Sequence, residues 1–96
     1  MTTFHIGVTG YSTEDFDKDK ARAYLNDAYD TMATLYPHHD MIVVSGLTNR
    51  GIPKLAYEEA VRRKWKTLGV ACEKAYGLEW FPVDEKPVII GTEWGD

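Results

Sequence analysis

Two short segments of the sequence combine glycine with hydroxyl or amide side chains, and each leads into a predicted helix. They are residues 9–12, Thr-Gly-Tyr-Ser, and residues 45–51, Ser-Gly-Leu-Thr-Asn-Arg-Gly. Glycine lets the backbone approach a phosphate closely, and a helix N-terminus offers free N–H groups with a partial positive charge. The sequence therefore predicts a phosphate- or nucleotide-binding site with these candidate residues: Thr9, Gly10, Tyr11, Ser12, Ser45, Gly46, Thr48, Asn49, Arg50 and Gly51.

Turn formation alone is a second explanation for both segments. Every strand-to-helix turn needs a tight corner, and corners favour glycine with serine or asparagine. The segments match neither the Walker loop, because Gly-Lys-Ser/Thr is missing, nor the G-x-G-x-x-G fingerprint. Two such turns at neighbouring strand tips nevertheless favour a ligand site, because open parallel sheets bind ligands at the carboxyl ends of their strands.

Three further places could do chemistry, and each has a simpler explanation. Glu73 follows a predicted strand and is a candidate ligand contact, although solvent exposure is the default for a carboxylate. Cys72 has no histidine beside it and fits a small, semi-buried apolar residue. Residues 38–40, His-His-Asp, fit a polar turn better than a metal site, because neighbouring histidine side chains diverge. We therefore expect no metal and no resident cofactor.

Four apolar segments predict strands, at residues 4–9, 41–44, 67–72 and 87–90. The second of them, Met-Ile-Val-Val, shows no period-two alternation. Such a run is typical of a strand that is covered on both faces of a parallel sheet.

Two helices are expected between these strands, at residues 17–35 and 52–64. Candidate N-caps for the first helix are Ser12, Thr13 and Asp17, and Pro37 ends that helix. The apolar stripe expected on the first helix is Ala21, Leu25, Ala28, Met32 and Leu35, at helical spacing. The second helix is expected to carry two exposed i,i+4 ion pairs, Glu58–Arg62 and Glu59–Arg63.

This order of elements predicts a single Rossmann-like α/β domain over residues 1–96, with a parallel sheet of about four strands. We expect the strand order 3-2-1-4 with helices on both faces, so that the ligand crevice lies between the first and fourth strands. The chain ends a few residues after the last predicted strand. This indicates either a minimal version of the fold or a truncated piece, and usual domain sizes favour truncation.

The segment 44–60, Val-Ser-Gly-Leu-Thr-Asn-Arg-Gly-Ile-Pro-Lys-Leu-Ala-Tyr-Glu-Glu-Ala, resembles a segment of the DNA-processing protein A group, S-G-x-A-x-G-I-D-x-x-A-H-x-x-A, with one extra loop residue. Residues 6–10 and 67–71 resemble the first and third strands of that group. The wider SLOG superfamily also holds the LOG cytokinin-activating hydrolases and the molybdenum-cofactor carriers. The resemblance covers about residues 4–72, and it implies a Rossmann-like fold that binds nucleotides or nucleotide derivatives.

At two positions the sequence departs from the family motifs, and each departure argues against one of the family's activities. The LOG motif P-G-G-x-G-T-x-x-E ends in a glutamate that acts on the ribose, and aligning Gly51 with its last glycine places Leu55 at that position. Glu58 and Glu59 are the nearest carboxylates and would be the catalytic residues of a hydrolase. The aspartate that follows G-I in the DNA-processing group is Pro53 here. We therefore expect poor or absent hydrolase activity.

The composition indicates which classes of binding partner and which cellular location to expect. The net charge of −4 argues mildly against nucleic acid, since DNA binding needs Lys and Arg to neutralise phosphates. The basic run 62–64 fits the solvated end of a helix. One cysteine, no signal peptide and no apolar stretch near ~20 residues predict a cytoplasmic protein without a membrane span. Trp80, Phe81 and Trp94 either cover a sheet face or line a partner surface, and the second interpretation predicts a homo-oligomer.

The sequence thus predicts a SLOG-like domain that senses or carries a nucleotide derivative. The first alternative is a nucleotide or nucleotide-sugar hydrolase that uses Glu58, Glu59 or Glu73. The second alternative is an interaction scaffold whose ligand site has decayed. A carboxylate beside a ribose would favour the hydrolase, whereas a tight, unreactive ligand would favour the sensor or carrier.

Overall fold

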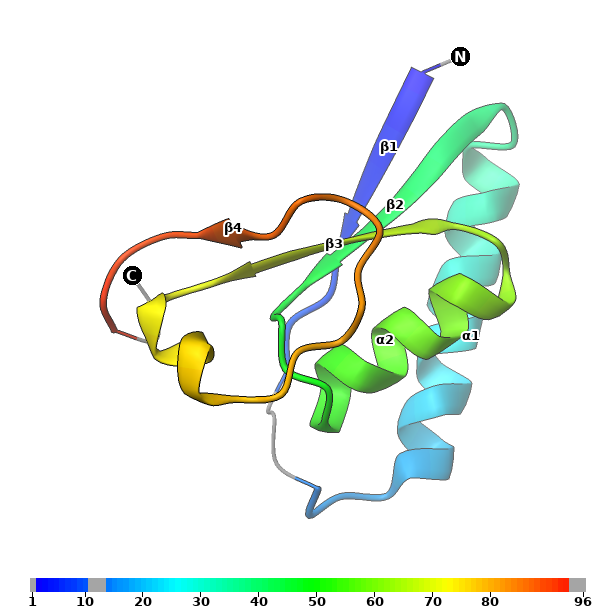
Figure 1. The fold of residues 1–96 in the computed structure, drawn as a ribbon. Helices are drawn as coiled ribbons and strands as arrows, with labels where there is room; N and C mark the ends of the chain where they lie inside the picture. Colours follow the sequence, from blue (N-terminus) through cyan, green and yellow to red (C-terminus); the bar gives the residue numbers. More distant parts are fainter. Residues whose placement is uncertain (1, 11–13, 94–96) are drawn as a thin grey trace.

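The computed structural model describes residues 2–10 and 14–93, which form a four-stranded parallel sheet with two α-helices (Figure 1). The strands are β1 (Thr2–Gly7), β2 (His39–Ser45), β3 (Lys66–Ala71) and β4 (Val88–Ile89). The helices are α1 (Lys18–Leu35) and α2 (Gly51–Arg62), and a short 3₁₀ helix η1 (Glu73–Gly77) follows β3. The predicted α/β class and the parallel, Rossmann-like sheet are confirmed.

β4 lies beside β3, so the strand order is β1-β2-β3-β4 and the prediction of the fourth strand beside the first is wrong. The carboxylate of Asp84 accepts hydrogen bonds from the backbone N–H of Thr67 (2.9 Å) and from its hydroxyl (3.1 Å). The N–H of Glu85 donates to the Thr67 carbonyl (3.0 Å). These bonds hold residues 84–85 at the start of β3, and the next strand therefore pairs with β3.

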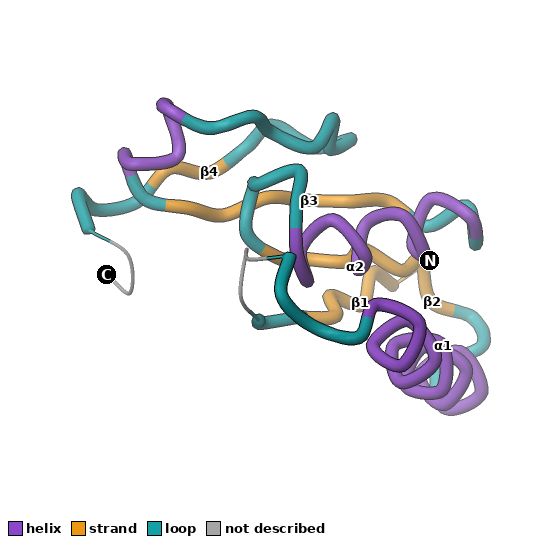
Figure 2. Tube along the Cα trace, turned by 90° about the horizontal axis from the view of Figure 1, so that it is seen from below, coloured by secondary structure: helices purple, strands orange, loops and turns teal. Residues whose placement is uncertain are grey.

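The helices α1 and α2 lie side by side on one face of the sheet (Figure 2). There they form a core with the inward side chains of β1 and β2. The buried members of this core are Ile6, Tyr29, Met41, Val43, Ala56, Tyr57 and Ala60. Both crossovers run in the same direction along the sheet, and right-handed connections of that kind place their helices on the same face.

The prediction of helices on both faces is therefore wrong for the described residues. On the face opposite the helices, Ile42 and Val44 of β2 are only half-buried. Val70 of β3 and Val88 of β4 are exposed. The apolar run of β2 thus reflects a strand with one fully buried face and one partly covered face.

The helix α1 packs through a face centred on Tyr29. This side chain is buried, and its hydroxyl donates to the carbonyl of Ala56 on α2 (2.9 Å). Two members of the predicted stripe, Ala28 and Leu35, are exposed instead. Of the three candidate N-caps, Asp17 is the one that caps α1, because its carboxylate accepts the backbone N–H of Lys20 (3.0 Å).

The predicted i,i+4 pairs on α2 are replaced by an i,i+3 pair within α2 and by contacts with α1. Glu59 is buried, and it accepts hydrogen bonds from Arg62 Nε (2.6 Å) and Asn26 Nδ2 (2.9 Å). Arg63 pairs with Asp30 of α1 (2.6 Å) rather than with Glu59. A buried carboxylate needs several donors, and here one comes from α2 itself and one from α1.

Candidate functional site

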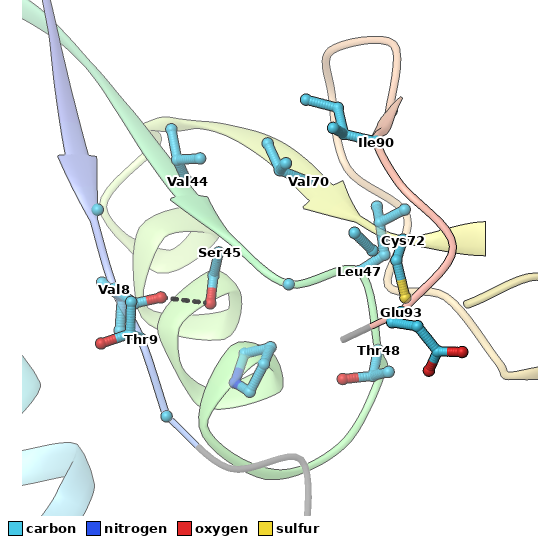
Figure 3. A pocket seen from close by; sticks show the side chains of 15 residues that line it. Val8, Thr9, Val44, Ser45, Leu47, Thr48, Val70, Cys72, Ile90 and Glu93 are labelled. Carbon is cyan, nitrogen blue, oxygen red and sulfur yellow. Dashed lines mark hydrogen bonds between the residues drawn. The ribbon is translucent and has the colours of Figure 1, made fainter. Parts of the chain in front are cut away.

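A cavity of about 440 Å³ lies at the carboxyl ends of β1, β2 and β3 (Figure 3). Its walls come from the end of β1 and the turn after it, the loop after β2, the end of β3, and the segment after β4. Five of the predicted ligand-binding residues line it: Thr9, Gly10, Ser45, Gly46 and Thr48. The two segments singled out in the sequence therefore meet in one concave site.

The remaining wall is mostly apolar. Side chains that contribute to it include Val8, Val44, Leu47, Val70 and Ile90. Among the described residues, Glu93 is the one charged residue that lines the cavity, and its carboxylate pairs with Lys74 of η1. The cavity can thus enclose an apolar body and offers only a few polar groups to orient it, as small-molecule sites commonly do.

Ser45 and Gly10 have structural roles in forming the cavity. The Ser45 hydroxyl donates to the Val8 carbonyl (2.7 Å), so it links the end of β2 to the turn after β1. A Cβ atom on Gly10 would lie 2.6 Å from Ile52 Cβ at the start of α2. Position 10 must therefore be glycine for the turn after β1 to pack against α2. At Gly46 a Cβ atom would only touch Pro53 Cγ at 3.5 Å, which is an ordinary contact.

The loop after β2 is held by groups that the sequence did not identify as important. The buried hydroxyl of Tyr57 accepts the N–H of Ser45 (3.1 Å) and lies 2.6 Å from the Gly46 carbonyl and 2.9 Å from that of Leu68. Burial raises the pKa of Tyr57, so this hydroxyl keeps its proton as a donor. A tyrosine at a helical core position is ordinary in sequence, and only the fold shows that it ties two strand ends together.

The same loop pairs with residues 79–81. The Phe81 N–H donates to the Leu47 carbonyl (2.8 Å), and the Asn49 N–H donates to the Glu79 carbonyl (2.9 Å). The Phe81 ring packs at 5.0 Å from Tyr57, and Trp80 Nε1 donates to the Ala75 carbonyl (2.6 Å). Trp80 and Phe81 thus make their contacts within the chain, whereas Trp94 lies outside the described residues.

Thr48 differs from the other polar residues of the wall. It is 2 % exposed, and its hydroxyl has no hydrogen-bond partner. Figure 3 shows this hydroxyl pointing towards the side of the cavity on which Val8 and Thr9 lie. Buried polar atoms in native structures almost always have a partner, so an orphaned hydroxyl in a cavity wall calls for an explanation.

Four predicted contacts lie outside the cavity, and Tyr11 and Ser12 lie outside the described residues. Asn49 is engaged with Glu79, and Arg50 is the exposed N-cap residue of α2. Glu73 is the exposed first residue of η1. Gly51, the fourth, begins α2 with a φ of 64°, which favours glycine.

The N-terminus of α2 holds a carboxylate of the chain itself. The N–H of Gly51 donates to Glu14 Oε1 (3.1 Å), and the Glu14 carboxylate also pairs with Lys18. Hydrogen bonds from Lys18 and then from Gly51 lower the pKa of Glu14 below its ordinary value. Glu14 thus places a carboxylate of the chain at the helix N-terminus where the sequence predicts the phosphate of a ligand. Nothing in the local sequence relates residue 14 to residue 51.

The alternative catalytic carboxylates do not line the cavity. Glu59 is buried between α1 and α2, as described above. Glu58 is half-buried and lies 3.7 Å from Arg22 of α1, beside a small polar depression of about 170 Å³ that Leu55 also lines. Cys72, in contrast, does line the cavity and is 4 % exposed, more deeply buried than expected.

The His-His-Asp segment lies away from the cavity, because His39 and Asp40 begin β2 while the cavity is at its other end. His39 packs against Phe4 and Tyr36 through its ring. In residues 2–10 and 14–93, no three His, Cys, Asp or Glu side chains gather as metal ligands would. Within the same residues, neither helix is long and apolar enough to cross a lipid bilayer.

The resemblance to the SLOG superfamily remains a prediction. No protein-family model, no curated protein and no solved structure matches the chain.

Proposed function

We propose that this domain binds a nucleotide derivative in the cavity at the carboxyl ends of β1–β3, as a SLOG-like sensor or carrier. The observation that carries the proposal is the convergence of the turn after β1 and the loop after β2, which are far apart in sequence, on one concave site. A volume of about 440 Å³ falls within the range of small-molecule sites, roughly 300–1,000 Å³. The position also agrees with the rule that open parallel sheets bind ligands at the carboxyl ends of their strands.

The positions of the carboxylates favour binding over hydrolysis. A general acid or base must come within about 2.6–3.2 Å of the proton that it transfers, directly or through one water. Glu58, Glu59 and Glu73 lie outside the cavity wall, and Glu93 in the wall is ion-paired with Lys74. A ligand in this cavity would therefore be held without a carboxylate placed for its hydrolysis.

Replacement of Gly46 by valine tests the site. The added Cβ makes only an ordinary contact with Pro53, so Gly46→Val is expected to fold while its methyl groups fill the cavity. Isothermal titration with adenosine, guanosine, cytidine, uridine and their 5′-monophosphates should show binding to the natural chain and its loss in the variant. Gly77→Val is the matched control, because a Cβ at Gly77 meets nothing within 4 Å and Gly77 is not in the cavity wall.

Two results would contradict the proposal. One is a natural chain that binds none of these compounds and releases no nucleotide derivative on denaturation, as judged by mass spectrometry. The other is a Gly46→Val variant that binds as tightly as the natural chain. Release of free base from a monophosphate, lost in Glu58→Gln or Glu59→Gln, would instead support the hydrolase.

We also propose a homo-oligomer and a cytoplasmic location. Trp80 and Phe81 pack within the chain, but Val70, Val88 and Ile90 leave apolar surface exposed on and beside the sheet. The single cysteine, Cys72, is a buried free thiol, which suits a reducing compartment. A constant monomeric mass by light scattering over a wide concentration range would rule out the oligomer.

A further inference from the structure

We infer that the cavity selects an uncharged head group, a nucleoside or free base rather than a nucleoside phosphate, and that the Thr48 hydroxyl recognises it. This inference rests on the proposed function and names the chemical class that the same site prefers.

The charges around the cavity disfavour a phosphate. No Lys, Arg or His among the described residues lines it, and its one charged residue, Glu93, is acidic. Transfer of an anion into a mostly apolar site without a cation is strongly unfavourable. Phosphate sites normally supply Arg or Lys donors or free N–H groups of a helix N-terminus.

The N-terminus of α2 is already engaged. The Gly51 N–H that would serve a phosphate donates to the Glu14 carboxylate, which Lys18 holds in place. A phosphate would have to displace a carboxylate that is already satisfied by a cation and a backbone donor. The charges in the cavity wall and at the N-terminus of α2 therefore both favour a neutral ligand.

The orphaned hydroxyl of Thr48 indicates where such a ligand makes its polar contact. Ser45 lines the same cavity, but its hydroxyl is already bonded to the Val8 carbonyl. Thr67 is also a buried threonine, and its hydroxyl both donates to and accepts from Asp84. Thr48 alone of these three keeps an unused hydroxyl, and Thr48 belongs to the cavity wall.

A nucleobase matches this combination of surfaces. Its flat faces can pack on apolar side chains such as Val44, Val70 and Ile90, and its edge carries both acceptors and donors for a hydroxyl. A buried hydroxyl left unpartnered in the free protein and paired in the complex discriminates strongly between ligands that can and cannot pair with it.

The decisive comparison combines binding and stability in Thr48→Val, with Thr48→Ser as the variant that keeps the hydroxyl. The probes are the four nucleosides and their 5′-monophosphates, titrated by calorimetry at constant ionic strength. We expect at least one nucleoside to bind about tenfold or more tightly than its monophosphate. Thr48→Val should weaken that nucleoside about tenfold or more, and Thr48→Ser should largely restore it.

In the absence of ligand, the same Thr48→Val substitution should stabilise the protein rather than impair it. Because valine has the shape of threonine without its unpaired hydroxyl, Thr48→Val is expected to raise the melting temperature of the ligand-free domain. A merely structural threonine would not couple a gain in stability to a loss in affinity. Thr31→Val, an exposed threonine of α1 remote from the cavity, is the matched control and should leave nucleoside affinity unchanged.

Each outcome separates the two proposals. If the natural chain binds none of the probes, the proposed function itself fails. If monophosphates bind as tightly as nucleosides or more tightly, the preference for a neutral ligand is wrong while the proposed function stands. If Thr48→Val binds the nucleoside as the natural chain does, Thr48 is not the recognition residue.

Discussion

The Leu47 side chain lies directly on the bare backbone of Gly69: a Cβ atom built at position 69 would sit 1.9 Å from Leu47 Cδ2. Leu47 is fully buried, and it belongs to the cavity wall. Gly69→Ala should therefore force Leu47 out of its place and lower the free energy of unfolding by about 1–3 kcal/mol, the usual effect of overpacking. Urea denaturation measures this change.

Gly77→Ala is the control for that substitution. A Cβ atom at Gly77 meets no atom within 4 Å, so stability should change by only a few tenths of a kcal/mol, as at most surface positions. Equal stabilities of Gly69→Ala and the natural chain would show that Leu47 has room to move.

A second prediction concerns the end of α2, where Lys64 has a φ of 63°. The N–H of Lys64 donates to the Val61 carbonyl and that of Trp65 to the Ala60 carbonyl, both at 2.9 Å. This is the Schellman arrangement, in which glycine is the favoured residue at the left-handed position. Lys64→Gly should stabilise the domain by about 1 kcal/mol, because the left-handed conformation costs other residues roughly 1–2 kcal/mol.

The matched variant Lys64→Ala removes the same side chain but keeps a Cβ atom. It should therefore give none of the stabilisation in thermal unfolding followed by circular dichroism. If alanine stabilised as much as glycine, the gain would come from the lost charge of the 62–64 run and not from the backbone.

A third prediction concerns the pH dependence of Glu59. Burial raises the pKa of this carboxyl, but hydrogen bonds from Arg62 and Asn26 outweigh burial, and the pKa lies below its ordinary value of 4.5. A carboxyl whose pKa is lower in the folded state stabilises the fold above its unfolded pKa and loses that contribution as the pH falls through the folded pKa.

Glu59→Gln should thus lower the free energy of unfolding by about 1.5–3 kcal/mol at pH 7, the usual worth of hydrogen bonds to a charged group. The difference between variant and natural chain should shrink below about pH 4.5. Glu58→Gln, at the half-exposed neighbour, should change stability far less. A deficit for Glu59→Gln that stays constant down to pH 2 would contradict a stabilising carboxylate.

Periodicity and turn chemistry predict the elements of this fold well. The four strands and two helices lie within about two residues of their predicted limits, because buried apolar runs, a capping residue and Pro37 as a stop are all local signals. The position of β4 is not a local property. It depends on Asp84 bonding to Thr67, a contact that joins residues 17 apart and has no signature in either segment.

The candidate site likewise contains residues that the local sequence predicts and residues that it does not. Gly46 and Thr48 belong to a turn that local composition identifies, so their place in the cavity wall could be predicted. Glu14 at the start of α2 could not, because its partner is 37 residues away. The predicted stripe on α1 is correct for Leu25 and Met32, which pack against the core. It leaves out Tyr29, whose ring is more deeply buried and whose hydroxyl reaches a carbonyl of α2.

The last prediction concerns the Tyr57 hydroxyl, which ties the cavity loop to the ends of β2 and β3. Tyr57→Phe keeps the ring in contact with Phe81 but leaves the Ser45 N–H without its acceptor. An unpaired buried donor costs about 1–3 kcal/mol, so the free energy of unfolding should fall by that amount at pH 7. Urea denaturation monitored by far-ultraviolet circular dichroism measures it.

The same variant makes a prediction at high pH. Because the pKa of Tyr57 is higher in the folded chain than in the unfolded one, its contribution to stability is complete below the unfolded pKa of about 10 and is lost as the pH rises further. The stability deficit of Tyr57→Phe should therefore narrow between about pH 10 and pH 12. Tyr76→Phe, at an exposed tyrosine of η1, should show neither the deficit at pH 7 nor its narrowing. An unchanged stability for Tyr57→Phe would show that the loop after β2 keeps its shape through its pairing with residues 79–81 alone.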